Sequence, residues 1–441
     1  IESWTIAYVW HSLVGTFKGV SPTEFFPNYL GMHDNSLFSL PVGAFAWFVG
    51  TLCLNVWILS RGLEKGVEIA AKIGMPLLFL FAAILAVRGL LLEPGVDPGV
   101  VESPLTGLNF VWQPQASGLA NPSVWLAAAG QVFFTLSVGM GSIHCYAAYL
   151  RRNDDIALNA ASAGWMNEFV EVILGSAILI PIATAYLGLA AVQTSTGGGS
   201  GFSLGFLTLP TLFNNWGWFA PVAGALWFGL LFFAGITSSL AMGQPIVAFL
   251  EDELGWQRRS AALAFGGATF ALGFVCVWLY PGGAFDEFDF WSGTFSLVVF
   301  ALAEAVIFSF IFGIEKGWTE ITRGADLKIP RVFRWIIRWV TPAFLLAVFL
   351  GALFKPEAGD WGAAFSNLAS GDGWSLAPDS VIGKVFHVGD GDYRWFDDAG
   401  RGTRALVQDA SRMVLMLVFL GVAGLVWKAW RRPGRAEGRK S

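Results

Sequence analysis

Long apolar segments recur along the whole chain, and they constrain its fold more than any other feature. A helix that crosses a bilayer needs roughly 20 predominantly apolar residues, and we identify about ten such segments. They cover residues 1–17, 38–60, 68–92, 123–150, 157–187, 218–250, 258–280, 290–313, 332–354 and 406–430. Only 13% of the residues are charged, against about 25% in a soluble domain. The sequence therefore predicts an all-α polytopic membrane protein, with residues 1–441 forming a single transmembrane domain.

The basic residues predict how these spans are oriented. Most of the 27 Lys and Arg residues fall at alternate ends of successive segments. They lie around Arg61, Arg151 and Arg258, between Lys316 and Arg338, and from Lys428 onward. The positive-inside rule makes these ends cytoplasmic, including the C-terminus with its basic tail 431–441. Residues 355–405, rich in Asp, Gly and Trp, then form a long external loop to which the sequence assigns no role. We expect a multi-pass protein of the cell (inner) membrane.

Two segments interrupt the helical pattern. The stretch QVFFTLSVGMG at 131–141 places Gly139 and Gly141 in the middle of a span. These glycines indicate either close helix packing or a discontinuous helix that frees backbone groups for a ligand. The second segment, Gly66 to Pro76, removes a backbone donor at Pro76 and is also explained by an ordinary kink.

Polar side chains inside the spans are candidates for an ion site, because such groups are costly in a membrane. Asn167 and Glu171 are four residues apart, and Ala234, Thr237 and Ser238 share one helix face. Thr135 and Ser137 lie in the glycine-interrupted segment. Hydroxyl, amide and freed carbonyl oxygens suit a small alkali cation and offer nothing to zinc or copper. The alternative is structural: Thr237 and Ser238 bond carbonyls one turn earlier, and Asn167 bridges helices.

Several long motifs carry a family resemblance. They are GQVFFTLSVGMGSIHCYAAYLRRNDDI (130–156), NEFVEVILGSAILIP (167–181), FFAGITSSLAMGQPIVAFLEDEL (232–254), DEFDFWSGT (286–294) and the opening IESWT. At these positions the chain resembles the neurotransmitter:sodium symporter family, including the bacterial LeuT-like amino-acid transporters. The resemblance runs through every span. It implies a LeuT-like inverted-repeat fold of twelve helices, of which the first two and part of the third are lacking. The first residues, which include no Met and no leader, fit that expectation.

The resemblance also implies the site residues. Thr135 and Asn167 resemble ligands of a first sodium ion, whereas the carbonyl of Ala234 and the hydroxyls of Thr237 and Ser238 resemble those of a second. The residues implied to line the substrate site are Phe134, Thr135, Ser137, Met140, Ser238 and Met242. Met140 and Met242 favour a hydrophobic or aromatic amino acid, since no charged residue accompanies them.

Gates and charge compensation follow from the same resemblance. Asp289 resembles the acidic half of an outer gate. Asp252, with Tyr149 and Gln244 nearby, resembles an inner gate. Glu171 resembles the fixed carboxylate of chloride-independent members, offsetting the charge of the sodium ion.

These observations predict a sodium-coupled, chloride-independent amino-acid symporter that works by alternating access. Its partners are the amino acid, sodium ions and the lipid bilayer, and no organic cofactor is expected. The net charge of −5 gives no indication of nucleic-acid binding, and the sequence leaves a homodimer open. The first alternative is a transporter-like sensor or receptor that binds without turnover. A channel would need a continuous polar stripe, and an enzyme would need a nucleophile and base at plausible spacing; the sequence shows neither.

Overall fold

The computed structural model describes residues 1–32, 40–120, 122–151, 153–198, 201–326, 329–388 and 401–431. Apart from one isolated bridge between Pro356 and Leu376, the described residues form helices, turns and loops. The chain divides into two compact units. Unit 1 comprises Ile1–Pro114 and Trp165–Pro281, and unit 2 comprises Gln115–Gly164 and Gly282–Ser441. The prediction of an all-α membrane protein is confirmed.

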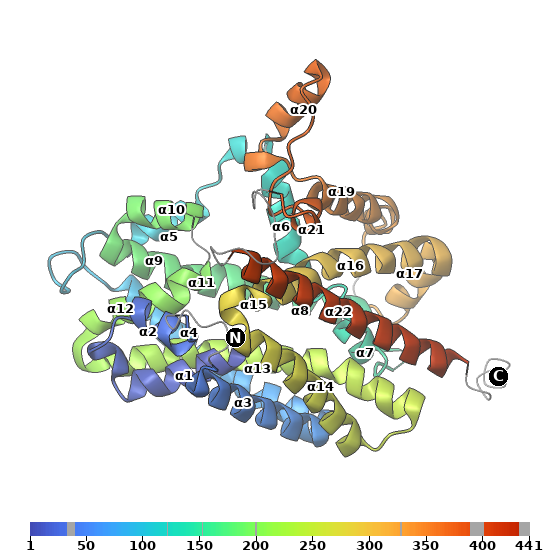
Figure 1. The fold of residues 1–441 in the computed structure, drawn as a ribbon, viewed down its shortest axis with the longest axis horizontal. Coiled ribbons are helices and arrows are strands. Elements are labelled where there is room, and N and C mark those ends of the chain that lie inside the picture. Colours follow the sequence, from blue (N-terminus) through green and yellow to red (C-terminus); the bar gives the residue numbers. More distant parts are fainter. Residues whose placement is uncertain are drawn as a thin grey trace. The chain divides into compact units, whose positions relative to one another are not determined.

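Unit 1 contains eleven α-helices, shown in Figure 1. They are α1 (Glu2–Leu13), α2 (Pro22–Tyr29), α3 (Val42–Ser60), α4 (Glu68–Leu90), α5 (Pro104–Trp112), α9 (Ser176–Leu187), α10 (Leu189–Gly198), α11 (Gly201–Ser203), α12 (Leu209–Phe213), α13 (Ala220–Leu254) and α14 (Arg258–Trp278). The long helix α13 packs against α1, α4 and α14. Its Leu240 is fully buried against Leu59 of α3, and Phe228 lies against the buried ring of Tyr8 from α1.

Unit 2 is built around paired helices. Its members are α6 (Pro122–Thr135), α7 (Ser142–Ala147), α15 (Ala284–Phe288), α16 (Ser296–Val306), α17 (Ile314–Arg323), α18 (Val332–Trp335), α19 (Thr341–Leu353), α20 (Trp361–Ser370), α21 (Val381–Val385) and α22 (Arg401–Trp430). Helix α8 (Ile156–Glu168) continues from unit 2 into unit 1. Val298 of α16 and Val348 of α19 form a small core with Phe133 of α6.

Short π-helical segments continue many of these helices. They are η2 (Leu63–Val67), η4 (Phe169–Gly175), η5 (Leu204–Thr208), η8 (Asp289–Phe295), η9 (Ile307–Gly313) and η10 (Ile336–Val340). Shorter 3₁₀ turns are η1 (Thr16–Lys18), η3 (Ala116–Ala120), η6 (Asn214–Phe219), η7 (Tyr280–Gly282) and η11 (Glu357–Gly359). Of the predicted irregular segment Gly66 to Pro76, only Gly66 and Val67 lie in η2, and residues 68–76, including Pro76, belong to α4. Such π-helical turns are frequent at functional sites.

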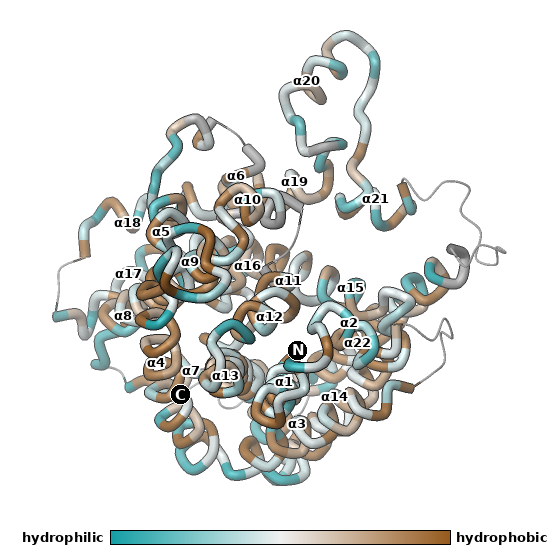
Figure 2. Tube along the Cα trace, turned by 90° about the vertical axis from the view of Figure 1, so that its left-hand side faces the viewer, coloured by the Kyte–Doolittle hydropathy of each residue, from teal (hydrophilic) through white to brown (hydrophobic). Residues whose placement is uncertain are grey.

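Eight helical segments among the described residues are long and apolar enough to cross a membrane, although Gly217 and Gly313 kink two of them. They are Val42–Ser60, Leu63–Leu90, Ile156–Leu187, Leu204–Leu254, Arg258–Trp278, Ala284–Arg323, Val332–Leu353 and Arg404–Trp430. Apolar residues run along helices such as α4 and α14 (Figure 2). The remaining two expected segments, 1–17 and 123–150, hold shorter helices, because α1 ends at Leu13 and the second segment is broken after Thr135. Residues 389–400 of the expected external loop and 432–441 of the expected tail lie outside the described residues.

Candidate functional site

A helix break in unit 2 forms one part of the candidate site. Helix α6 ends at Thr135 and α7 begins at Ser142, so six residues between them leave the helical path. Ser137, Gly139 and Gly141 take left-handed backbone conformations, with φ of 54°, 82° and 76°. A break of this kind exposes backbone N–H and C=O groups that a continuous helix would pair internally. The predicted discontinuity at 131–141 is therefore present.

Gly139 shows why the break needs a glycine. A Cβ atom at this position would lie 2.6 Å from the carbonyl oxygen of Leu297 and 2.9 Å from the backbone nitrogen of Ala301, both in α16. Neither backbone atom moves cheaply, and the positive φ disfavours any other residue. Gly141 shares the positive φ, but its missing Cβ would face open space. Both sequence interpretations hold here, because the helix is broken and one glycine packs closely.

Four predicted substrate residues lie at this break in unit 2: two end α6 and two are inside the break. Phe134 is 55% exposed, and Thr135, Ser137 and Met140 are half-buried. An exposed aromatic ring beside a break in a helix is available to cover a ligand.

The second part of the candidate site is a group of three oxygen atoms on α13 in unit 1. The Thr237 hydroxyl donates to the carbonyls of Phe233 and Ala234 at 2.9 and 3.0 Å, and the Ser238 hydroxyl donates to Ala234 at 3.0 Å. Both hydroxyls therefore bond carbonyls one turn earlier, which is the structural alternative that the sequence left open. Each hydroxyl oxygen still carries lone pairs, and the Ala234 carbonyl lies within 3.0 Å of both. Three hard oxygens grouped in this way can serve as ligands for an alkali cation.

The other predicted residues of unit 1 lie on three helical segments. Asn167 is half-buried in the last turn of α8, and Met242 is 47% exposed one turn beyond Ser238. Glu171 lies in η4 and is exposed, so unit 1 alone does not form the buried carboxylate environment expected around it. The first predicted sodium set is divided, since Thr135 belongs to unit 2 and Asn167 to unit 1.

The predicted gate residues differ in their surroundings. Asp289 is exposed at the first position of η8, Asp252 is exposed in the last turn of α13, and Tyr149 is 56% exposed. Gln244 is fully buried, and its side-chain oxygen accepts a hydrogen bond of 2.6 Å from the Arg258 guanidinium.

Arg258 was not predicted as a site residue. Its guanidinium also donates to the Leu59 carbonyl at 2.8 Å and forms an ion pair with Glu251 at 2.9 Å. The basic pair Arg258–Arg259, four residues after α13 ends, was the available signal, although charge counting used it only for orientation. Arg258 therefore links the ends of α3, α13 and α14.

A buried charge cluster in unit 2 was also missed. Glu287 is 1% exposed and accepts hydrogen bonds from the Arg412 guanidinium at 2.7 and 3.1 Å and from the Trp291 indole at 2.7 Å. Lys384 lies 3.7 Å from the Glu287 carboxylate, and Arg412 also pairs with Asp409 at 3.0 Å. The motif DEFDFW contains Glu287, but the sequence alone singled out only Asp289. This cluster ties part of the long loop, through Lys384, to α15 and α22.

Comparison with known proteins gives consistent matches. The model of the sodium:neurotransmitter symporter family matches residues 11–388. An uncharacterized sodium-dependent transporter of Methanocaldococcus jannaschii is 28% identical, over 80% of this chain and 70% of its own length. Sodium-dependent nutrient amino acid transporter 1 of Drosophila mojavensis is 26% identical, over 83% of this chain and 56% of its own. The crystal structure of MhsT in complex with L-phenylalanine superposes with a TM-score of 0.65 at 26% identity, covering 79% of this chain and 76% of MhsT.

Proposed function

Because the chain belongs to the sodium:neurotransmitter symporter family, we propose that it couples the movement of an amino acid across a membrane to that of sodium. The family places it among multi-pass membrane transporters and not among enzymes. The observation in this chain that carries the proposal is the break between α6 and α7. Helix breaks at membrane depth are tolerated where they line a cavity or bind a ligand.

The proposed mechanism uses the two groups of polar atoms described above. Four of the six amides at 136–141 donate to backbone carbonyls at 132–137. Other backbone groups at the break bind the charged ends of the amino acid, and side-chain oxygens bind sodium. Where a substrate carboxylate shares a sodium ion, each ligand strengthens binding of the other by a reciprocal free energy of about 1–3 kcal/mol. Alternating access then exposes the shared site to each side of the membrane in turn.

For one sodium ion we propose the Ala234 carbonyl with the Thr237 and Ser238 hydroxyls as protein ligands. The Ala234 carbonyl oxygen already lies 3.0 Å from each hydroxyl oxygen, so a cation would replace the three local hydrogen bonds that these two hydroxyls make. Thr135 and Asn167 are proposed for the other ion, shared with the substrate.

Removal of two hydroxyls on α13 tests the sodium assignment. In proteoliposomes, Thr237→Val combined with Ser238→Ala is expected to abolish sodium-stimulated uptake. Ser239→Ala is the matched control, because the Ser239 hydroxyl instead donates to the Asn55 side chain at 2.7 Å. Sodium dependence that survives the double substitution would show that these oxygens are not ligands.

For the substrate we propose a hydrophobic or aromatic amino acid. Phe134, Met140 and Met242 are adaptable apolar side chains, and the proposed pocket positions in this chain carry no charge to pair with Lys, Asp or Glu. The L-phenylalanine bound by MhsT is consistent with this choice. Competition for uptake should rank Leu, Phe and Trp above Lys, Asp and Glu, and the reverse ranking would refute it.

We further propose that transport does not require chloride. Glu171 supplies a fixed negative charge one turn from Asn167, which offsets sodium where an anion would otherwise be needed. Uptake should persist when gluconate replaces chloride, and Glu171→Ser should make it chloride-dependent. Glu168→Ser removes a charge from the same helix and should leave uptake indifferent to chloride. Loss of wild-type uptake when gluconate replaces chloride would contradict the proposal.

From the positions of the basic residues we propose that the protein lies in the inner membrane with its C-terminus in the cytoplasm. Asp289 is then the proposed outer gate residue, and Asp252, Tyr149 and Gln244 contribute to an inner gate. A homodimer is compatible with these assignments.

The second candidate is a sensor that binds the same amino acid without turnover. The match to a family of symporters favours turnover over binding alone. Counterflow of labelled amino acid in liposomes separates the two, since a receptor binds the label but does not accumulate it.

A further inference from the structure

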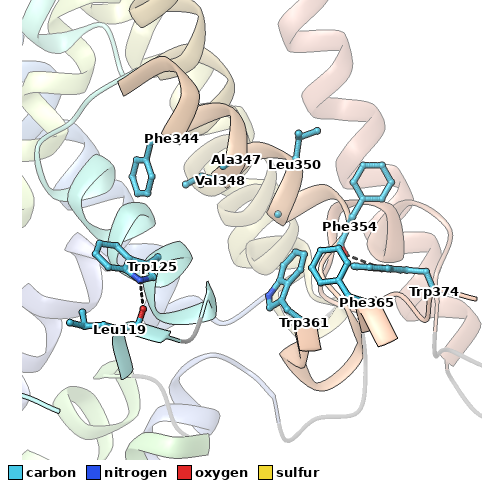
Figure 3. Close-up of a pocket in the computed structure, with 11 residues that line it drawn as sticks. Leu119, Trp125, Phe344, Ala347, Val348, Leu350, Phe354, Trp361, Phe365 and Trp374 are labelled. Atoms are coloured by element: carbon cyan, nitrogen blue, oxygen red, sulfur yellow. Dashed lines mark hydrogen bonds between the residues drawn. The ribbon is translucent and has the colours of Figure 1, made fainter. Parts of the chain in front are cut away.

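An apolar groove of about 720 Å³ lies within unit 2, beside the last turns of α19 (Figure 3). Its walls come from α19, from α20 and the chain after it, and from the start of α6. The eleven lining residues are all apolar or aromatic, so no charged side chain is present to recognise the ammonium or carboxylate of an amino acid. Its size falls in the range of roughly 300–1,000 Å³ that small organic ligands occupy.

One polar atom in this groove lacks a partner. The indole nitrogen of Trp361 is buried and forms no hydrogen bond in the structure. The other two tryptophans in the lining are satisfied: Trp125 donates to the Leu119 carbonyl at 2.9 Å and Trp374 to the Phe354 carbonyl at 3.1 Å. Figure 3 shows these two bonds and an indole nitrogen on Trp361 that faces the α6 side of the groove. A buried N–H group without an acceptor is costly, so the site favours an occupant that brings one.

Helix α20 is a ten-residue helix with an apolar stripe and no charged side chain. Trp361, Phe365 and Leu368 recur at i, i+4 and i+7, and Phe365 and Leu368 are 59% and 55% exposed. An exposed apolar stripe on a short helix next to the end of a membrane span fits the boundary between headgroups and acyl chains. Aromatic residues, here including Phe354 and Trp374, are enriched at that level.

We propose that the groove binds one acyl chain of an outer-leaflet phospholipid, whose ester carbonyl accepts a hydrogen bond from the Trp361 indole. The apolar walls match the acyl chain, the unpaired N–H matches the neutral acceptor next to it, and α20 lies flat in the interface. The outer leaflet follows from the proposed orientation, in which α19 starts among the basic residues Arg331, Arg334 and Arg338 and ends outside. The site is separate from the proposed substrate and sodium residues and does not depend on their assignment.

Photo-crosslinking maps the occupant directly. The protein is reconstituted in nanodiscs that contain a phospholipid with a diazirine near the glycerol end of one acyl chain, and cross-linked peptides are located by mass spectrometry. We expect cross-links in 344–354 and 361–374. Ala347→Phe, which adds a ring to the groove, should reduce their yield at least fivefold. Leu346→Phe is the matched control, since Leu346 is 46% exposed on the same helix but does not line the groove.

The hydrogen bond has its own test. An ester-linked phospholipid should compete with the probe about three- to tenfold better than its ether-linked analogue, which lacks the carbonyl acceptor. Trp361→Phe keeps the ring, removes the N–H and should abolish that preference. Equal competition by both lipids in the wild type would overturn the hydrogen bond.

Cross-links in the wild type that avoid both peptides would overturn the proposal, independently of any variant. Cross-links between two copies of the chain at α20 would show that a second protein molecule fills the groove and would also overturn it. Uptake of amino acid is measured in parallel. Loss of uptake without loss of cross-linking concerns the proposed function, whereas loss of cross-linking alone concerns the lipid site.

Discussion

The two units present their candidate groups on helices that are built differently. In unit 1, α13 continues for 35 residues, and Thr237 and Ser238 are satisfied by carbonyls one turn earlier. In unit 2, α6 stops at Thr135, and the next residues are set by left-handed backbone conformations. The site in unit 1 therefore depends on side-chain chemistry, whereas the site in unit 2 depends on backbone shape. Adding a single Cβ atom at a glycine of the break therefore tests the second site.

The largest effect is expected for Gly139→Ala. The new methyl group would lie 2.6 Å from a backbone atom of α16. The alanine would also have to adopt a φ of 82°, which favours glycine. Overpacking costs about 1–3 kcal/mol and a non-glycine residue in the left-handed region about 1–2 kcal/mol. We expect loss of uptake and a clearly lower melting temperature in detergent.

Two glycines of the same segment separate the causes. Gly141→Ala keeps the positive φ but meets open space, so only the conformational cost of about 1–2 kcal/mol remains. Gly130→Ala in α6 has neither problem and should be neutral or slightly stabilising. If all three substitutions change uptake and melting temperature equally, the left-handed backbone of the break does not determine the function of the site in unit 2.

Charged groups give a second contrast between the units. Glu287 in unit 2 is almost completely buried, whereas the carboxylate of Glu251 in unit 1 is 27% exposed. Arg412→Met leaves Glu287 buried without its main partner and should destabilise the protein by about 3–5 kcal/mol. The double variant Glu287→Leu with Arg412→Met should recover most of that loss, because it removes both charges. Thermal unfolding of the single and double variants measures the difference, and a double variant as unstable as the single one would contradict it.

Arg258→Met should cost less. Its guanidinium and the Glu251 carboxylate are partly solvated, so losing the ion pair costs up to about 1 kcal/mol. Loss of the bond to buried Gln244 adds about 1–3 kcal/mol. Arg259→Met is the control, since Arg259 is exposed next to it. A loss of stability equal to that of Arg412→Met would show that burial of the carboxylate does not determine the cost.

The sequence predicted the features that depend on local periodicity. Apolar runs located the spans, Gly139 and Gly141 located the helix break, and the spacing of Thr237 and Ser238 placed both hydroxyls near one carbonyl. In each case the cause lies within about one helical turn of the residues concerned.

Features that depend on distant contacts were not predictable in the same way. Glu287 and Arg412 are 125 residues apart, and hydropathy does not reveal which of three neighbouring carboxylates is buried. The π-helical segments, such as η4 around Glu171, have no distinctive amino-acid composition. They nevertheless change which side chains share a helix face. The loop that received no role from the sequence supplies Lys384 to the charge cluster and Trp361 to the lipid groove.

Among the charged groups compared, Asp97 is expected to give the smallest loss of stability when it is replaced. The backbone N–H of Glu93 and the Arg88 guanidinium, at 3.0 and 2.7 Å, lower the pKa of the Asp97 carboxyl below its usual range. A lowered pKa in the folded state means that the pair stabilises the protein above the unfolded pKa of about 3.9, and that this contribution disappears as pH falls through the folded value.

Asp97→Asn should therefore lower stability by no more than about 1 kcal/mol at pH 7, because the Arg88 side chain that pairs with it is 33% exposed. The gap between wild type and variant should close as pH is lowered from about 5 to 3, which thermal unfolding at several pH values would record. Glu93→Gln retains the backbone donor and should show no such convergence. A gap that widens in acid would mean that the Asp97 carboxylate is disfavoured in the folded protein.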